Sequence, residues 1–323
     1  MVVGKEVYIP STNGRNQLHV WIWKSTDKEP KAVLQISHGM VEHIARYKKF
    51  AQYMAERGII VVGNDHLGHG GSVASEAEFG YFNASNPSQT VVADLYAVTQ
   101  YMKNLYPDLP YFLLGHSMGS FMARRYLMTY GKVLNGAIIM GTGQFPRLAV
   151  ALCKPILAVL KKIKGGYYRS IKLNQLSFGN FNNQFNATRT THDWLSRNEV
   201  AIDEYLSDPQ CNFLFTLNGY ETILQTFAFI GKHQNINKIP KKLPIIFMAG
   251  REDPVGENGV IVREIYKQYQ RFGMEQVELK IYDQDRHELL HELDRLTVFH
   301  DIYNWLETYI ASASNTVEKK ESI

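Results

Sequence analysis

Short apolar runs alternate with amphipathic stretches over the first 143 residues of the chain. Apolar runs bounded by turn residues predict buried strands, and apolar residues at three- and four-residue spacing predict helices. The predicted strands cover residues 6–9, 17–23, 32–37, 59–62, 111–114 and 136–140, and the predicted helices cover residues 46–57, 88–106 and 121–130. Asn13-Gly14 predicts a hairpin turn between the first two strands, which we expect to be antiparallel. The alternation that follows predicts a parallel sheet with helices on both faces.

The alternation stops after residue 143 and resumes after residue 242. Residues 144–242 hold no clear strand but include helix-like stretches at 194–205 and 222–230. A structureless loop of this length is implausible in a compact domain, so we predict a mainly helical insertion, called the cap below. Residues 243–311 then add strands at 245–248 and 278–282 around a helix at 260–272. The sequence therefore predicts an α/β fold with an eight-stranded sheet, its core at 1–143 and 243–311, and a disordered polar tail at 312–323.

The first part of the cap combines apolar and basic residues. Residues 147–172 contain no Asp or Glu, and their apolar positions are followed by Lys161, Lys162 and Lys164. The run is too short to span a membrane and contains Lys154 and Pro155. Such a segment suits an interfacial helix that lies against acyl chains while its lysines meet anionic head groups. It equally suits a helix that packs on the domain with solvated lysines, and the two interpretations are compatible.

Composition narrows the class of protein further. The net charge of +4 on 323 residues is too small to indicate a nucleic-acid partner, and no nucleic-acid motif accompanies it. The first ten residues lack the basic segment and apolar core of a secretory signal, so we expect a cytoplasmic protein, with peripheral contact to a membrane through the cap. The two cysteines, Cys153 and Cys211, have no partner at metal-ligand spacing, so neither a disulfide framework nor a metal site is expected.

Candidate chemistry begins at Gly115-His116-Ser117-Met118-Gly119, which lies between a predicted buried strand and a predicted helix. A serine at such a junction must take a strained turn, and the flanking glycines remove side chains that would collide there. The turn holds the Ser117 hydroxyl out of the sheet. The N-terminus of the following helix then allows the Met118 N–H to stabilise an oxyanion beside Ser117. We therefore interpret Ser117 as a nucleophile.

An acidic residue follows the next strand of the predicted core. Asp253 comes just past the carboxyl end of the strand at 245–248, where open α/β sheets place ligands and catalysis. Glu252 and Asp285 are competing carboxylates. Glu252 is merely the residue next to Asp253. Asp285 is too close in sequence to the candidate histidine, His287, to approach it from a separate strand. We predict Asp253 as the acid of a catalytic triad.

His287 follows the last predicted strand, from which an imidazole can reach both Ser117 and Asp253. Its rival, His291, is predicted one turn into the final helix, where a surface or capping role suits it better. His287-Glu288-x-x-His291 also matches the His-Glu-x-x-His zinc pattern. A metalloprotease is disfavoured because no third ligand is obvious and the serine turn already accounts for the histidine.

Five motifs in order resemble the monoacylglycerol lipase and lysophospholipase branch of the α/β hydrolases. These are Gly115-His116-Ser117-Met118-Gly119, His38-Gly39-Met40-Val41-Glu42-His43 with Arg46-Tyr47, Asp65-His66-Leu67-Gly68-His69-Gly70, Gly250-Arg251-Glu252-Asp253-Pro254-Val255 and Arg286-His287-Glu288. The resemblance covers nearly the whole core and weakens in the cap. It implies the α/β-hydrolase fold and makes the Met40 N–H the second oxyanion donor beside Met118. A methionine stands where the family often has a small residue, so chain-length preference is not transferred.

The resemblance and the residues together predict a serine ester hydrolase that cleaves a small lipid or ester substrate, either a monoacylglycerol or a lysophospholipid. Its acyl-enzyme chemistry requires no metal or organic cofactor. One alternative is an aminopeptidase-like serine peptidase on the same scaffold, whose substrate amine would meet Asp203, Glu204 and Asp208. Another is a non-catalytic scaffold that binds a ligand, which the presence of all three triad residue types disfavours.

Overall fold

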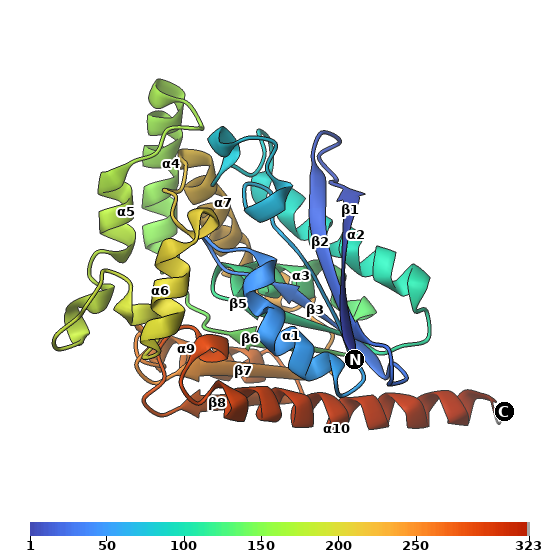
Figure 1. Ribbon diagram of the computed structural model, residues 1–323. Helices are drawn as coiled ribbons and strands as arrows, with labels where there is room; N and C mark the ends of the chain where they lie inside the picture. Colours follow the sequence, from blue (N-terminus) through green and yellow to red (C-terminus); the bar gives the residue numbers. More distant parts are fainter. Residues whose placement is uncertain (322–323) are drawn as a thin grey trace.

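The computed structural model describes the backbone of residues 1–321 and the side chains of residues 1–312. One eight-stranded sheet runs through the molecule in the order β1-β2-β4-β3-β5-β6-β7-β8 (Figure 1). Its strands are β1 (Val2–Pro10), β2 (Gln17–Ser25), β3 (Ala32–Ser37), β4 (Ile59–Asn64), β5 (Tyr111–His116), β6 (Gly136–Met140), β7 (Ile245–Gly250) and β8 (Val277–Tyr282). The β1–β2 and β2–β4 pairs are antiparallel, and the other pairs are parallel. The predicted eight-stranded, mostly parallel sheet is confirmed.

Helices cover both faces of this sheet (Figure 1). One group consists of α2 (Pro87–Leu105), α3 (Met118–Tyr130) and α9 (Val260–Arg271), and the other of α1 (Lys48–Ala55) and α10 (Arg295–Glu321). Successive side chains of a strand point to opposite faces, so each buried strand serves both cores. In β5, Tyr111 and Leu113 pack with the first group, whereas Phe112 and Leu114 pack with the second. All four side chains are fully buried, which explains why these consecutive positions are hydrophobic.

The chain between β6 and β7 forms the cap. It contains α4 (Arg147–Lys164), α5 (Ile171–Phe178), α6 (Glu199–Ser207), α7 (Leu217–Ile230) and α8 (His233–Ile236), joined by short 3-10 turns. α7 packs on α2 and α3 of the core and also against α4. α4 and α5 lie on the outer side of the molecule, away from the sheet (Figure 1). In the part of the chain that the structure describes, no helix combines the length and hydrophobicity required to cross a membrane.

Two segments differ from the sequence expectation. The helix expected over residues 194–205 is divided into a 3-10 turn at Asp193–Leu195, a non-helical connection at residues 196–198 and α6. The tail expected to be disordered over residues 312–323 instead continues α10 through Glu321, and residues 322–323 lie outside the described residues. Extending an existing helix needs no new nucleus, so a polar segment can add turns to it.

Candidate active site

Ser117 sits between the last residue of β5 and the first residue of α3. Its backbone has φ 52° and ψ −121°, in a region that residues other than glycine rarely occupy. Two glycines make this turn sterically feasible. A Cβ at Gly119 would lie 1.9 Å from the Ser37 carbonyl oxygen, and one at Gly115 would lie 2.5 Å from the Gly119 carbonyl oxygen. Ser117 is partly exposed while its neighbours in sequence are buried, so the turn presents its side chain outward.

Two backbone N–H groups flank the serine. Met118 is the first residue of α3, where a helix leaves its N–H groups without helical acceptors. Met40 follows Gly39, and the Gly39 backbone runs so close to the serine that a Cβ on it would lie 3.2 Å from Ser117 Cβ. Among the described residues, neither the Met40 N–H nor the Met118 N–H donates a hydrogen bond. Both donors predicted for the oxyanion are therefore uncommitted.

The candidate base and acid meet directly. His287 Nδ1 lies 2.9 Å from Asp253 Oδ1, and both side chains are almost completely buried. The competing carboxylates face elsewhere. Asp285 pairs with Arg197 of the cap, and Glu252 lies 3.8 Å from Arg286 at the surface. Of the three acids considered from the sequence, Asp253 is the one in contact with the imidazole.

The imidazole of His287 lies beside the serine turn. A Cβ at Gly141 would lie 3.1 Å from His287 Cε1, and the residue before Gly141, Met140, accepts a 3.0 Å hydrogen bond from the Ser117 N–H. His116, which precedes the serine, has its ring centroid 5.0 Å from that of His287. Within the described residues no hydrogen bond joins the Ser117 hydroxyl to the imidazole. Such bonds are often long in ligand-free sites and shorten when substrate binds.

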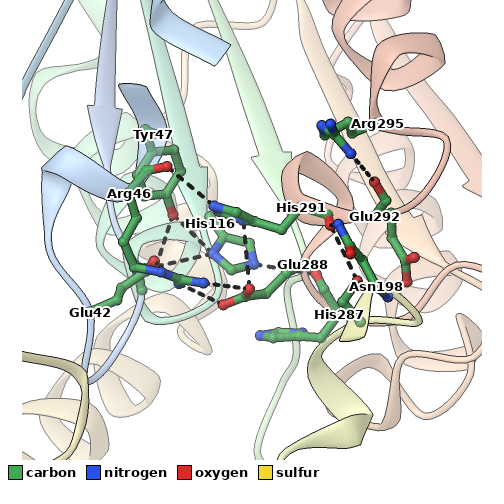
Figure 2. A network of polar contacts seen from close by, with 12 residues as sticks. Glu42, Arg46, Tyr47, His116, Asn198, His287, Glu288, His291, Glu292 and Arg295 are labelled. Carbon is green, nitrogen blue, oxygen red and sulfur yellow. Dashed lines mark hydrogen bonds and ion pairs between the residues drawn. The ribbon is translucent and has the colours of Figure 1, made fainter. Parts of the chain in front are cut away.

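A buried polar network joins the loops around these residues (Figure 2). Arg46 donates to Glu42 at 2.7 Å and, through both terminal nitrogens, to Glu288 at 2.8 Å. Glu42 also accepts from the Gly39 N–H and from the Tyr47 hydroxyl, the latter at 2.9 Å. One guanidinium thus connects the loop after β3, which carries Met40, with the residue next to His287. Bidentate arginine–carboxylate pairs fix geometry as well as charge.

The charges of this network are set by its own members. Burial alone would raise the pKa of Glu288, but the Arg46 guanidinium outweighs it and lowers that pKa to about 2. Burial would likewise raise the pKa of Glu42, yet His116 and Arg46 lower it. For His116, burial favours the neutral ring, but the hydrogen bond with Glu42 raises its pKa. The sequence alone did not assign a role to Glu42, Arg46 or Glu288. Their place in the motifs that resemble the family was the one indication that they matter.

His291 differs from the surface histidine expected on the final helix. It lies in a 3-10 turn at Leu289–His291, before α10 begins, and its Nε2 is 3.3 Å from the Arg46 carbonyl oxygen. Burial lowers its pKa to about 4, and the neighbouring Arg46 adds to this effect. His287 instead turns to Asp253, so the two histidines of the zinc-like pattern have different partners. The pattern does not lie on a regular α-helix, as the zinc motif requires.

Tertiary structure brings together two other sets of potential metal ligands. His43, Asp208 and Cys211 lie within 4.8 Å of one another, a proximity that their sequence spacing could not reveal. Burial raises the pKa of the Cys211 thiol, which disfavours the thiolate that a metal needs, and His43 Nε2 is already 2.8 Å from Asp208. The second set, Asp285, Glu292 and Asp294, surrounds a guanidinium of the cap.

Each acidic residue that a peptidase would need already contacts a basic side chain. Asp203 pairs with Arg189 at 2.8 Å, Glu204 lies 3.5 Å from Lys49, and Asp208 contacts His43. An aromatic side chain of the cap faces the imidazole instead. The ring of Trp194 lies 5.1 Å from that of His287 and packs on Phe178 and Phe181. The cap therefore presents apolar surface to the candidate catalytic residues.

The chain is similar to known proteins over most of its length. Residues 28–294 match a family model described as serine aminopeptidase, S33. Human monoglyceride lipase is 28% identical over 298 residues, which cover 90% of this chain and 87% of that protein. A monoacylglycerol lipase of Mycolicibacterium smegmatis is 24% identical over 294 residues, covering 90% and 92%. Among solved structures, a thermostable carboxyl esterase from Bacillus coagulans in complex with glycerol has a TM-score of 0.88 at 29% identity, covering 95% of this chain and 99% of that one.

Proposed function

The chain belongs to the serine aminopeptidase S33 family of α/β hydrolases, and we propose that it is a carboxylic ester hydrolase that uses Ser117 to cleave monoacyl lipids. One observation carries the catalytic part of this proposal. The strained Ser117 turn, its two uncommitted N–H groups and the buried His287–Asp253 pair adjoin one another at the carboxyl ends of neighbouring strands. Ester hydrolysis by a serine requires these parts together.

Each residue has a defined task in the reaction. An alcohol is a poor nucleophile at neutral pH, so His287 takes the Ser117 proton as the oxygen attacks the ester carbonyl. Asp253 holds the imidazole in the required tautomer and stabilises its protonated form. The N–H groups of Met40 and Met118 receive the oxyanion; losing one such donor typically costs about 100- to 1000-fold in rate. The alcohol leaves with the proton from His287, and a water molecule activated by the same imidazole then releases the fatty acid from the acyl-serine.

The apolar surface of the cap supports a lipid substrate. Trp194 and its neighbours offer aromatic contacts beside His287, where an acyl chain can bury surface. Monoglyceride and monoacylglycerol lipases are among the relatives that match most of the chain. A monoacyl glyceride or a lysophospholipid fits both observations.

The outer face of α4 supports contact with the lipid surface that holds such substrates. Apolar side chains recur there at helical spacing, and each of them is at least 59% exposed: Leu148, Leu152, Ile156, Val159 and Ile163. Exposed lysines, among them Lys154, Lys162 and Lys164, flank this apolar stripe. Contiguous exposed apolar surface beside basic residues is typical of a helix that lies in a membrane interface.

Hydrolysis of a substrate panel tests the proposal. We expect the purified protein to hydrolyse a monoacylglycerol or a lysophospholipid faster than short soluble esters, and a fluorophosphonate to label it. Ser117→Ala should abolish turnover and labelling while circular dichroism stays unchanged. Activity restricted to short esters would refute the lipid assignment. Full labelling of the Ser117→Ala variant would refute the nucleophile.

A further inference from the structure

Arg197 of the cap reaches into the loop that carries His287. It lies in the non-helical connection between the 3-10 turn at Asp193–Leu195 and α6, and its guanidinium contacts three carboxyl groups. Its Nη2 pairs with Asp285 and lies 2.9 Å from Asp294 Oδ1, and its Nε lies 3.2 Å from Glu292 Oε2. The three acids come from one short segment that encloses His287.

This contact is buried and electrostatically demanding. The side chains of Asp285 and Glu292 are fully buried, and one guanidinium compensates three carboxyl groups. Burial, together with Asp294 and Glu292, raises the pKa of Asp285 to about 8. Glu292 also accepts the backbone N–H of Arg197 at 3.1 Å and that of Arg286 at 2.9 Å. Removal of the guanidinium would leave these acids without a matching cation.

Further contacts link the same two segments. The Glu288 N–H donates to the Leu195 carbonyl oxygen at 2.7 Å, directly after His287. The Asn198 side-chain amide donates to the His291 carbonyl oxygen at 3.0 Å (Figure 2), and Trp194 lies on the ring of His287. The stretch from Trp194 to Asn198 therefore holds the histidine loop from the side opposite to Arg46.

We propose that Arg197 is a positioning residue, which holds the loop of residues 285–294 so that the His287 imidazole faces Ser117. The inference rests on the catalytic role proposed for His287. It assigns this part of the cap to the catalytic geometry. Arg197 makes these contacts from the non-helical residues 196–198, between the 3-10 turn and α6.

The test compares Arg197→Met with Arg189→Met. Arg189 also lies in the cap and forms an ion pair there, but its partner is Asp203 of α6 and its side chain is 41% exposed. We expect Arg197→Met to lower kcat on a soluble short ester and the rate of fluorophosphonate labelling by about 10- to 100-fold, with KM nearly unchanged. Arg189→Met should retain both rates.

A double variant separates positioning from loss of stability. Arg197→Met/Asp285→Asn leaves two carboxyl groups without the guanidinium instead of three, so the melting temperature should recover in part while kcat stays low. This variant also carries the test if Arg197→Met fails to fold. Recovery of kcat together with the melting temperature, or normal labelling of folded Arg197→Met, would overturn the inference. Wild-type protein that no fluorophosphonate labels would instead refute the proposed function itself.

Discussion

Replacing the apolar stripe of α4 should separate lipid-surface activity from ester chemistry. The perturbation is the triple variant Leu152→Gln, Ile156→Gln and Ile163→Gln. The three wild-type residues are 59, 68 and 71% exposed. They point away from the core, so the folded state loses little packing. The variant should unfold at nearly the wild-type temperature.

The size of the effect follows from the exposed area. Complete burial of such a side chain is worth about 1.5–3 kcal/mol, so partial immersion of each side chain contributes about 1 kcal/mol. Loss of three such contributions, about 3 kcal/mol, weakens partitioning into vesicles by about 100-fold. The lysines beside the stripe remain, so the residual binding should depend more steeply on anionic lipid and salt.

Vesicle flotation measures partitioning directly, and paired assays measure the consequence for catalysis. The triple variant should lose activity on monoacylglycerol dispersed in vesicles and retain kcat/KM on a soluble short ester. A matched control substitutes Gln at Leu105, Val260 and Leu296, which are 53, 57 and 63% exposed on separate elements. Equal partitioning of the two triple variants would refute the assignment of the stripe to a lipid surface.

Four further changes have defined outcomes. Gly119→Ala should destabilise the protein by several kcal/mol in urea unfolding, because its Cβ would overlap a carbonyl oxygen at 1.9 Å; a stable, active variant would contradict the turn geometry. Asp253→Asn should lower kcat by about 10⁴-fold without unfolding the protein, as steady-state assays would detect. Burial lowers the pKa of His66 to about 3 and that of His69 to about 4. Below about pH 6.5 the unfolded chain binds protons at these rings and the folded chain does not. The free energy of unfolding should therefore fall as the pH is lowered from about 6.5 to 4. The raised pKa of Asp285 has the opposite effect on the free energy of unfolding, because the folded state keeps this proton up to about pH 8. Its contribution to stability should therefore decline as the pH rises from about 4 to 8. Asp285→Asn should flatten that decline in thermal scans.

The fold could be read from the sequence because its signals are local. Each central strand contains a short run of apolar residues, and the glycines around Ser117 mark a turn that other residues could not form. The predicted sheet and the resemblance to the α/β hydrolases are confirmed, while the roles of Ser117, Asp253, His287, Met40 and Met118 remain predictions.

The remaining features depend on contacts between distant segments. Arg46 and Glu288 are 242 residues apart, and nothing in either neighbourhood indicates that they pair. The helix expected over residues 194–205 has a suitable apolar pattern, but it is interrupted at residues 196–198, where Arg197 pairs with acids of the distant histidine loop. His291 likewise is half-buried, with its Nε2 against the Arg46 carbonyl oxygen. The spacing of apolar residues indicates which face of a segment is buried, but it does not indicate which distant residues contact that segment.

The way the cap is attached has a practical consequence for protein engineering. α7 is anchored on α2 and α3, whereas α4 and α5 form the outer part of the insertion. We therefore expect α4, residues 147–164, to be the part of the cap that can be exchanged, since the Phe178 ring of α5 packs on Trp194. Grafting the equivalent segment of a relative should retune the choice between dispersed and aggregated substrates while the hydrolytic machinery stays intact.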